Sequence, residues 1–402
     1  MALLASAACA SSVDPGGATS NSSLAHIPDL PRDLTASEQQ AVTATNAFSF
    51  RLFRQASAAQ GSTSMMISPL GAALGLGLAM DGAQGATYDQ MRSALSLDAV
   101  SGADPVSGVR SLTALLGSLD PIGSFSIGNA LWYRGDFPLN PSYAATEAGT
   151  RIGALDFASP ASVQTINMWA SDASIGRIPS IVDHIDSSQS LLLTNTSYFR
   201  GNWNARFDPA DTHSDVFYAA AGPQAASYMY RRGLMLYYAS HDLEAVDLPF
   251  GGGAFSMMIV QPRGSLTIDA VAALLEAGAW TDLVGKVRDV GMNLFVPRFR
   301  IVYDRTLNAD LQGLGVRDAF IPNGADFTRM SPRGRELSLG VVKQKTLIDV
   351  NEDGTIASAG GTLVGSTSGF VPLVMRAERP FLFVIRERAS GTIVFIGKVM
   401  SV

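Results

Sequence analysis

The sequence predicts an α+β protein with large antiparallel or mixed β-sheets and a helical N-terminal half. Helical patterns cluster mainly in the first half of the chain, whereas segments rich in β-branched and aromatic residues dominate the second half. This segregation argues against a regular βαβ repeat. Hydrophobic residues make up 47% of the 402 residues, which is ample for a sizeable core.

Two helices are expected near the start of the folded region. Thr35 stands three residues before Glu38, the spacing of a capping box, and opens an amphipathic helix that includes TATNAFSFRLFR. Ser68-Pro69 then ends a short strand, SMMIS, and opens a second helix, GAALGLGLAMDGA. Because this segment is apolar on every face, we expect it in the interior.

Further segments bounded by Gly, Pro or Asn are predicted strands. They are IGNALWYRG, LLLTNTSYFRG, EAVDLPF, FSMMIVQP, VGMNLFVPRFRIVY, GVVKQKTLIDV, PFLFVIRER and GTIVFIGKV. Helical patterns recur around residues 266–285 and 304–314. Ala389-Ser390-Gly391 supplies a turn between the last two strands, which predicts a hairpin in the core.

Charge and cysteine content argue against several classes of function. The 29 basic and 35 acidic residues give a net charge of −6, and the basic residues do not gather on one segment, so no nucleic-acid partner is expected. Cys9 is the only cysteine, which excludes an internal disulfide. The four histidines are far apart and lack HExxH spacing, so neither a metal nor another cofactor is expected.

No sequence motif for nucleophilic catalysis is complete. GSTSG at 365–369 resembles a nucleophile elbow, but Thr367 occupies the place of the serine. No serine stands three residues before a lysine, and the GxxxxGK[ST] loop is absent. The sequence therefore favours a protein that is not an enzyme over a hydrolase with an unrecognised site.

Eight stretches carry a family pattern in a fixed order. The first four are NAFSFRLFRQ, SMMISPLGAALGLGLAMDGAQGATYDQM, INMWASDASIGRIPSIV and LLLTNTSYFRGNW. MNLFVPRFRI, LQGLGVRDAF, ADFTRMS and AERPFLFVIRERASGTIVFIGKV follow. The matching positions include Asn167, Trp169, Gly176, Ile178, Asn195, Phe199, Gly201 and Trp203. Together these stretches, which cover about residues 37–402, resemble the serpin family of serine protease inhibitors, and in particular an inhibitory-type bacterial member.

The resemblance implies one serpin domain over residues 36–402 with an exposed reactive-centre loop at about 353–372. In this family a target protease attacks the loop as a substrate. The cut loop then inserts as a new strand into the main sheet and carries the acylated protease with it. The implied partner is a serine protease in a covalent 1:1 complex, with a cysteine protease as a further candidate, and the implied inhibitor is a monomer.

The loop NEDGTIASAGGTLVGSTSGFVP suits such an insertion. Alternate residues of an inserted strand must face the core, and all of them are small or apolar: Thr355, Ala357, Ala359, Gly361, Leu363 and Gly365. None would bring an unpaired charge into the sheet. At roughly 3.3 Å per residue, residues 355–368 would span about 45 Å, enough to move a bound protease across the molecule.

The resemblance assigns a hinge and a bond for cleavage. The hinge of inhibitory members is similar to Glu352, Gly354, Thr355, Ala357, Ser358 and Ala359. Counting from Gly354 places the bond at Ser368-Gly369, whereas counting back from Pro380 permits Gly369 or Phe370 instead. Thr-Ser-Gly suits an elastase-like or subtilisin-like protease, and Phe370 suits a chymotrypsin-like one.

Two departures from the family pattern bear on insertion. Ile356 replaces the usual acidic residue, and each loop glycine raises the cost of ordering a strand by about 0.5–1 kcal/mol relative to alanine. The residues implied to control sheet opening are Ser68, Asn195, Trp203 and Gln344. Gln344 replaces a family histidine, and we expect its amide to bond Asn195 without the pH sensitivity of imidazole.

Residues 1–35 are predicted to form a disordered tail. The opening MALLASAACASSVDPGGATSNSSLAH joins a short apolar run to a Ser/Gly/Pro-rich segment, which fits the remnant of an export signal or a lipoprotein linker, with Cys9 placed like a lipid acceptor, and equally fits a plain tail. The first interpretation implies a secreted or cell-envelope protein. No other stretch approaches about 20 apolar residues, so no membrane span is expected.

The main alternative to an inhibitor is a non-inhibitory serpin that acts as a binding or carrier protein. Such members tend to have bulky, charged or proline residues in the hinge, where this chain has small ones.

Overall fold

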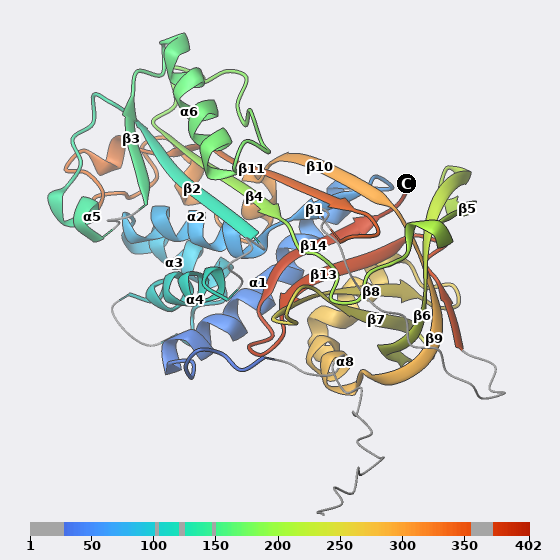
Figure 1. Ribbon diagram of the computed structural model, residues 1–402. Helices are drawn as coiled ribbons and strands as arrows, with labels where there is room; N and C mark the ends of the chain where they lie inside the picture. The colour runs from blue at the N-terminus through green and yellow to red at the C-terminus, as the bar shows by residue number, and fades with distance from the viewer. Residues whose placement is uncertain (1–27, 101–103, 120–124, 147–149, 355–372) are drawn as a thin grey trace, which may run out of the picture.

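The computed structural model describes residues 28–100, 104–119, 125–146, 150–354 and 373–402. Helices, most of them from the first half of the chain, pack against two large β-sheets (Figure 1). Their bounds are α1 (Ala36–Gln60), α2 (Pro69–Asp81), α3 (Gly85–Ala94), α4 (Ser107–Gly117), α5 (Pro141–Thr146), α6 (Pro160–Ala173), α7 (Ile268–Leu274), α8 (Trp280–Lys286) and α9 (Asn308–Gly313). The α+β class predicted from the sequence is confirmed.

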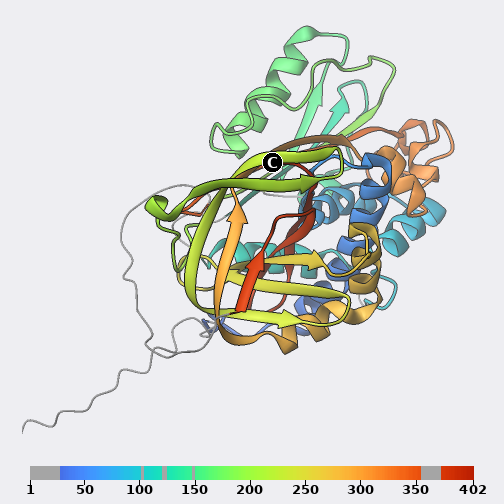
Figure 2. The ribbon, with the colours of Figure 1, turned by 90° about the vertical axis from the view of Figure 1, so that its right-hand side faces the viewer.

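The first sheet has nine strands and includes the last strands of the chain. Its order is β1 (Met65–Ile67), β14 (Ile393–Val399), β13 (Phe381–Glu387), β8 (Phe255–Pro262), β7 (Leu243–Pro249), β6 (Gly222–Ala239), β9 (Arg288–Pro297) and β12 (Leu373–Arg376), with β5 (His213–Ala219) paired to β6. Figure 2 shows β6 and β9 running side by side along this sheet.

The second sheet has five strands and contains the candidate site. Its order is β10 (Phe299–Thr306), β11 (Leu339–Val350), β4 (Leu191–Phe199), β2 (Phe125–Arg134) and β3 (Arg151–Leu155). The outer pair β10/β11 and the pair β4/β2 are antiparallel, whereas β11/β4 and β2/β3 are parallel. The sheet is therefore mixed, with a parallel pair near its centre.

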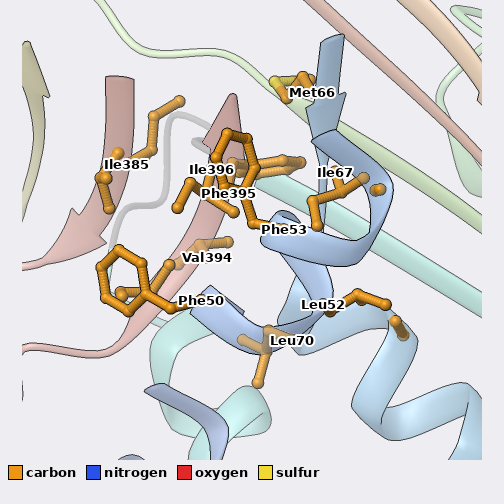
Figure 3. Packing of buried hydrophobic residues seen from close by; sticks show 14 of the residues in the cluster. Phe50, Leu52, Phe53, Met66, Ile67, Leu70, Ile385, Val394, Phe395 and Ile396 are labelled. Carbon is orange, nitrogen blue, oxygen red and sulfur yellow. The ribbon is translucent and has the colours of Figure 1, made fainter. Parts of the chain in front are cut away.

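The core lies where α1 and α2 meet the last strands. In Figure 3, Phe53 of α1 lies beside Phe395 and Ile396 of β14, and these three residues and Leu70 of α2 are fully buried. Every residue of β13 and β14 is buried, which confirms the predicted C-terminal hairpin in the core. Burying so many aromatic and aliphatic side chains supplies most of the driving force for folding.

The predicted start of the first helix also agrees with the structure. The capping box of α1 is complete, because Glu38 N–H donates to Thr35 Oγ1 and Thr35 N–H donates to the Glu38 carboxylate. The structure describes residues 28–35, which the sequence assigns to the tail. Arg32 in this segment forms an ion pair with Glu38 at 2.6 Å. The rest of the predicted tail lies outside the described residues.

Some elements differ from the prediction. Four strands were not predicted from the sequence: the 18-residue β6 and the shorter β3, β5 and β12. The helical pattern at 266–285 is interrupted, because Gly278 has a φ of +101° between α7 and α8. A glycine adopts this conformation without the steric cost that other residues meet, so the chain can turn there.

Candidate functional site

The site is built on the parallel pair formed by β4 and β11, which we call the β4–β11 interface. Its register runs from Leu191 opposite Leu339 to Tyr198 opposite Leu347. Because the strands are parallel, the chain leaves β11 beside the end of β4, near Phe199. Parallel pairing is slightly less stable per residue than antiparallel pairing. We therefore expect β4 and β11 to separate more easily than an antiparallel pair of the same length.

Gln344 ties the β4–β11 interface to the helix layer. Its side-chain Nε2 donates to Asn195 Oδ1 at 2.8 Å and to the Ser68 carbonyl at 2.9 Å. Its Oε1 accepts a hydrogen bond from Ser68 N–H at 3.0 Å. Gln344 is only 1% exposed, so these bonds form away from water, where leaving a polar group unpaired is costly. The Gln344–Asn195 bond expected from the sequence is present.

Asn195 extends these contacts across the sheet. Its Nδ2 donates to Asn129 Oδ1 at 3.0 Å and to the Gly128 carbonyl at 3.1 Å, and its Oδ1 accepts from Ser197 Oγ at 2.8 Å. We refer to Ser68, Asn129, Asn195, Ser197 and Gln344 as the polar network. It joins β11, β4 and β2 to the start of α2, so separating β4 from β11 must break it.

Helix α2 can approach the polar network because it carries glycines on that side. Ser68 caps the helix, and its Oγ accepts from Gly71 N–H at 3.2 Å and donates to the Val394 carbonyl at 3.1 Å. A Cβ atom on Gly71 would lie 2.6 Å from Asn195 Nδ2, and one on Gly75 would lie 3.0 Å from Asn129 Oδ1. Larger residues would push the helix away from the sheet.

A tight turn follows β11. Asn351 N–H donates to the Gly354 carbonyl at 2.8 Å, and Gly354 N–H donates to the Asn351 carbonyl at 3.1 Å. Gly354 has a φ of +122°, and a Cβ atom there would lie 2.1 Å from the Gly201 carbonyl oxygen. Only glycine fits this position, since any side chain would meet both backbone strain and a direct clash.

Trp203 holds this turn at the end of β4. Its indole Nε1 donates to the Asn351 carbonyl at 2.9 Å, and its backbone N–H donates to the Asp353 carbonyl at 2.9 Å. The indole ring stacks on Phe250, with centroids 4.5 Å apart. The first residues of the predicted hinge are therefore fixed beside the point where β4 and β11 end.

Glu352 adds a charged anchor to the turn. It is 4% exposed, accepts a hydrogen bond from Arg298 Nε at 2.7 Å, and accepts another from the Thr212 hydroxyl. Burial by itself raises the pKa of this carboxyl, but the bonds from Arg298 and Thr212 outweigh it and hold the pKa below its ordinary value. The carboxylate is therefore the favoured form at neutral pH.

The structure places the predicted site residues in two groups. Ser68, Asn195 and Gln344 lie together in the polar network, whereas Trp203 lies with Glu352 and Gly354 at the turn. The other predicted residues lie outside the described part of the chain: Cys9, Thr355, Ile356, Ala357, Ser358, Ala359, Ser368, Gly369 and Phe370.

Sequence reasoning missed Asn129, Ser197, Thr212 and Arg298. Asn129 carried a usable signal, because it is a polar residue inside the apolar segment IGNALWYRG and lies directly opposite Asn195 in the sheet. Arg298 carried none, since its partner Glu352 is 54 residues away in sequence.

The described residues hold neither a candidate metal cluster nor a membrane-spanning helix. They contain no group of three His, Cys, Asp or Glu side chains that could hold a metal ion. None of the helices in this part of the chain has the length and apolar character needed to cross a membrane.

Comparison with known proteins gives one consistent result. The family described as serpin (serine protease inhibitor) matches residues 43–402. An uncharacterised serpin-like protein of Thermococcus kodakarensis is 30% identical over 376 residues, which are 90% of this chain and 86% of that protein. Leukocyte elastase inhibitor A of Mus musculus is 28% identical over 384 residues, which are 90% of this chain and 100% of that protein.

Solved structures agree on the fold. The thermophilic serpin tengpin in its native state superposes with a TM-score of 0.80 at 25% identity, and the match covers 92% of this chain and 96% of tengpin. Human thyroxine-binding globulin, complexed with thyroxine, shares the fold with a TM-score of 0.83 at 20% identity, covering 91% of this chain and 99% of the globulin. With a family match over most of its length, the chain belongs to the serpin family.

Proposed function

We propose that the protein is a suicide-substrate inhibitor of serine proteases, in which residues 355–368 insert between β4 and β11 after cleavage. The observation that carries this proposal is the parallel β4–β11 interface, with the 351–354 turn at its end. A strand that runs back from Gly354 would be antiparallel to β11, and hence to β4 as well. Insertion would replace one parallel pair by two antiparallel pairs, which are the more stable arrangement.

The chemistry of trapping follows from ordinary serine protease catalysis. The protease serine attacks the carbonyl carbon of Ser368, the amine of Gly369 leaves, and an ester joins the two proteins. Insertion competes with hydrolysis of this ester, because water regenerates an active protease if the strand inserts too slowly. The polar network affects the rate of insertion, since Gln344 and Asn195 must separate before the strand can enter.

An elastase-like or subtilisin-like enzyme is the proposed target, with cleavage at Ser368-Gly369. The small residues Thr367, Ser368 and Gly369 suit a small primary pocket, and the mouse relative is named as an inhibitor of an elastase. Cleavage after Gly369 or Phe370 is the alternative, and Phe370 would direct the inhibitor to chymotrypsin-like enzymes.

The direct test mixes the protein with pancreatic elastase. We expect a complex that survives boiling in detergent and a released C-terminal fragment that begins at Gly369. Mass spectrometry of the fragment identifies the bond, because cleavage after Gly369 or Phe370 would give a fragment that begins at Phe370 or Val371. Complete cleavage with fully active elastase and no complex would contradict the proposal.

The inward face of the inserted strand gives a matched pair of variants. Thr355→Arg would place a charge in the sheet interior, so we expect cleavage without trapping. Ile356→Arg adds the same charge on the opposite face and should still trap elastase. Equal trapping by both variants would overturn the proposed register of insertion.

We also propose that the inhibitor acts as a monomer outside the cytoplasm, with residues 1–35 as a tail. Lipid attachment at Cys9 is the part of this proposal that a mass measurement can test. Intact-mass analysis of the protein from its native cells tests it, because an acylated Cys9 adds the mass of its lipid.

A further inference from the structure

A cavity of about 320 Å³ lies where β2 becomes the edge of the five-stranded sheet. β3 pairs with β2 only from Ala130 onward, so the first half of β2 has β4 on one side and no described strand on the other. Leu74 and Leu78 of α2 line the cavity from one face of the sheet, and Trp169 of α6 lines it from the other. Figure 1 shows α2 and α6 on opposite sides of β2.

The lining combines apolar walls with positive charge. Arg110 and Arg151 both contribute to it, and the described residues that line it include no Asp or Glu. Arg110 already has acidic neighbours, because it pairs with Asp81 at 2.7 Å and also with Asp104. No carboxylate among the described residues lies within ion-pair distance of Arg151. Arg151 is an exposed residue, and its guanidinium lies 5.5 Å from the Trp132 ring centroid.

The cavity also reaches the polar network. Asn129 and Gly128 line it, and both accept a hydrogen bond from Asn195 Nδ2. Asn195 in turn accepts from Gln344 across the β4–β11 interface. A molecule in the cavity would therefore contact a residue two hydrogen bonds away from Gln344.

We propose that this cavity binds a small apolar carboxylate, such as an aryl- or alkyl-carboxylic acid, and that binding holds β4 and β11 together. The volume falls in the range of small-molecule sites, the apolar walls accommodate a ring or short chain, and Arg151 pairs with the carboxylate. A bound molecule packs α2 and α6 against β2 and contacts Asn129, which accepts a hydrogen bond from Asn195, so it favours the arrangement in which Asn195 also bonds Gln344 across the β4–β11 interface. The consequence for protease trapping rests on the proposed function, but the binding itself does not.

Isothermal titration calorimetry with 4-phenylbutyrate tests the site on the full chain. We expect saturable binding of one molecule per chain and binding weaker by about tenfold or more for the neutral 4-phenylbutanamide, because the amide cannot form the charged pair. Absence of saturable binding at millimolar concentrations would overturn the site.

Two arginine variants identify the recognition residue. Arg151→Gln should weaken binding of 4-phenylbutyrate by about tenfold or more. Arg177→Gln is the matched control, because Arg177 is also exposed and also stacks on an aromatic ring, that of Tyr198, but does not line the cavity. Equal loss of affinity in both variants would show that 4-phenylbutyrate binds elsewhere on the surface.

Hydrogen exchange tests the coupling to the sheet without using a protease. With 4-phenylbutyrate bound, we expect slower amide exchange in Leu191–Phe199 and Leu339–Val350, and unchanged exchange in β5 (His213–Ala219), which lies on the far side of the molecule from β2 (Figure 1). Binding without this protection would overturn the coupling. If 4-phenylbutyrate binds and protects these strands but elastase is never trapped under any condition, the proposed inhibitory function fails while the ligand site stands.

Discussion

Glu352 places a buried carboxylate beside the point where the proposed inserted strand would begin. Its pKa lies below the ordinary value of 4.5 because the bonds from Arg298 and Thr212 outweigh the effect of burial. Its stabilising contribution is therefore fully present above about pH 4.5, and it is lost as the pH falls through the lower folded-state pKa. Acid should loosen the 351–354 turn.

Replacing Glu352 tests this pH dependence. We expect Glu352→Gln to lower the free energy of unfolding by about 1–2 kcal/mol at neutral pH, toward the lower end because Arg298 is half exposed. As the pH falls below about 4.5, the difference between the variant and the wild type should shrink. Urea unfolding at a series of pH values measures both effects.

The control for this variant is Glu378→Gln, which removes a more exposed carboxylate paired with Arg376 at 3.3 Å. We expect a change below about 0.5 kcal/mol at every pH, as for other surface ion pairs. An equally large loss in Glu378→Gln would mean that general charge balance, and not the buried turn, explains the result for Glu352.

At the residue scale, the sequence predicted one contact between two polar side chains. It did not predict the contacts that depend on how distant segments pack together. The amide of Gln344 was expected to bond Asn195, and it does. The two further bonds from Gln344 to the backbone of Ser68 depend on how α2 sits on the sheet, which no local pattern encodes. The Arg298–Glu352 pair was missed for the same reason.

At the element scale, α2 and the polar network depend on one another. Gly71→Ala should lower the free energy of unfolding by about 1–3 kcal/mol, because the new Cβ would lie 2.6 Å from Asn195 Nδ2 and force the helix or the network to move. This loss would occur even though alanine is the better helix former. Thermal or urea unfolding measures the change.

Gly285→Ala in α8 is the matched control for Gly71→Ala. Gly285 is exposed, and a Cβ atom there would meet nothing within 4 Å. We expect a gain of up to about 1 kcal/mol from helix propensity alone. If both variants were stabilised, the close approach of α2 to Asn195 would not constrain the helix.

Strands were harder to predict than helices where their pattern was broken. α1 and α2 have clear caps, α1 has an amphipathic pattern and α2 a long apolar run, and both helices were predicted. β6 contains Pro223 near its start and Arg231-Arg232-Gly233 in its middle, so it lacks the continuous apolar pattern of β13 and β14. Its length is maintained by pairing with β5, β7 and β9, which is tertiary information.

At the scale of the whole molecule, the proposed function makes the uncut chain less stable than the cut one. Insertion of about fourteen residues would add hydrogen bonds worth on the order of 10 kcal/mol in total. The unfolding entropy of a chain of this length is roughly 0.8 kcal/mol per kelvin, so the unfolding temperature should rise by about 10 °C or more after cleavage.

Differential scanning calorimetry before and after cleavage of the loop measures this shift. Thr355→Arg, cleaved in the same way, should show a much smaller rise, because its strand is prevented from inserting. No rise in the cleaved wild type would contradict insertion and would favour the alternative of a non-inhibitory binding or carrier serpin.

The pairing of β1 with β14 has a consequence for biosynthesis. Within the described part of the chain, Met65, Met66 and Ile67 pair with Lys398, Gly397 and Ile396, more than 300 positions later. A ribosome must therefore translate nearly all of the message before this edge of the nine-stranded sheet can form. Such distant pairing slows folding and leaves the nascent polypeptide exposed to aggregation, so we expect chaperones to matter during its synthesis.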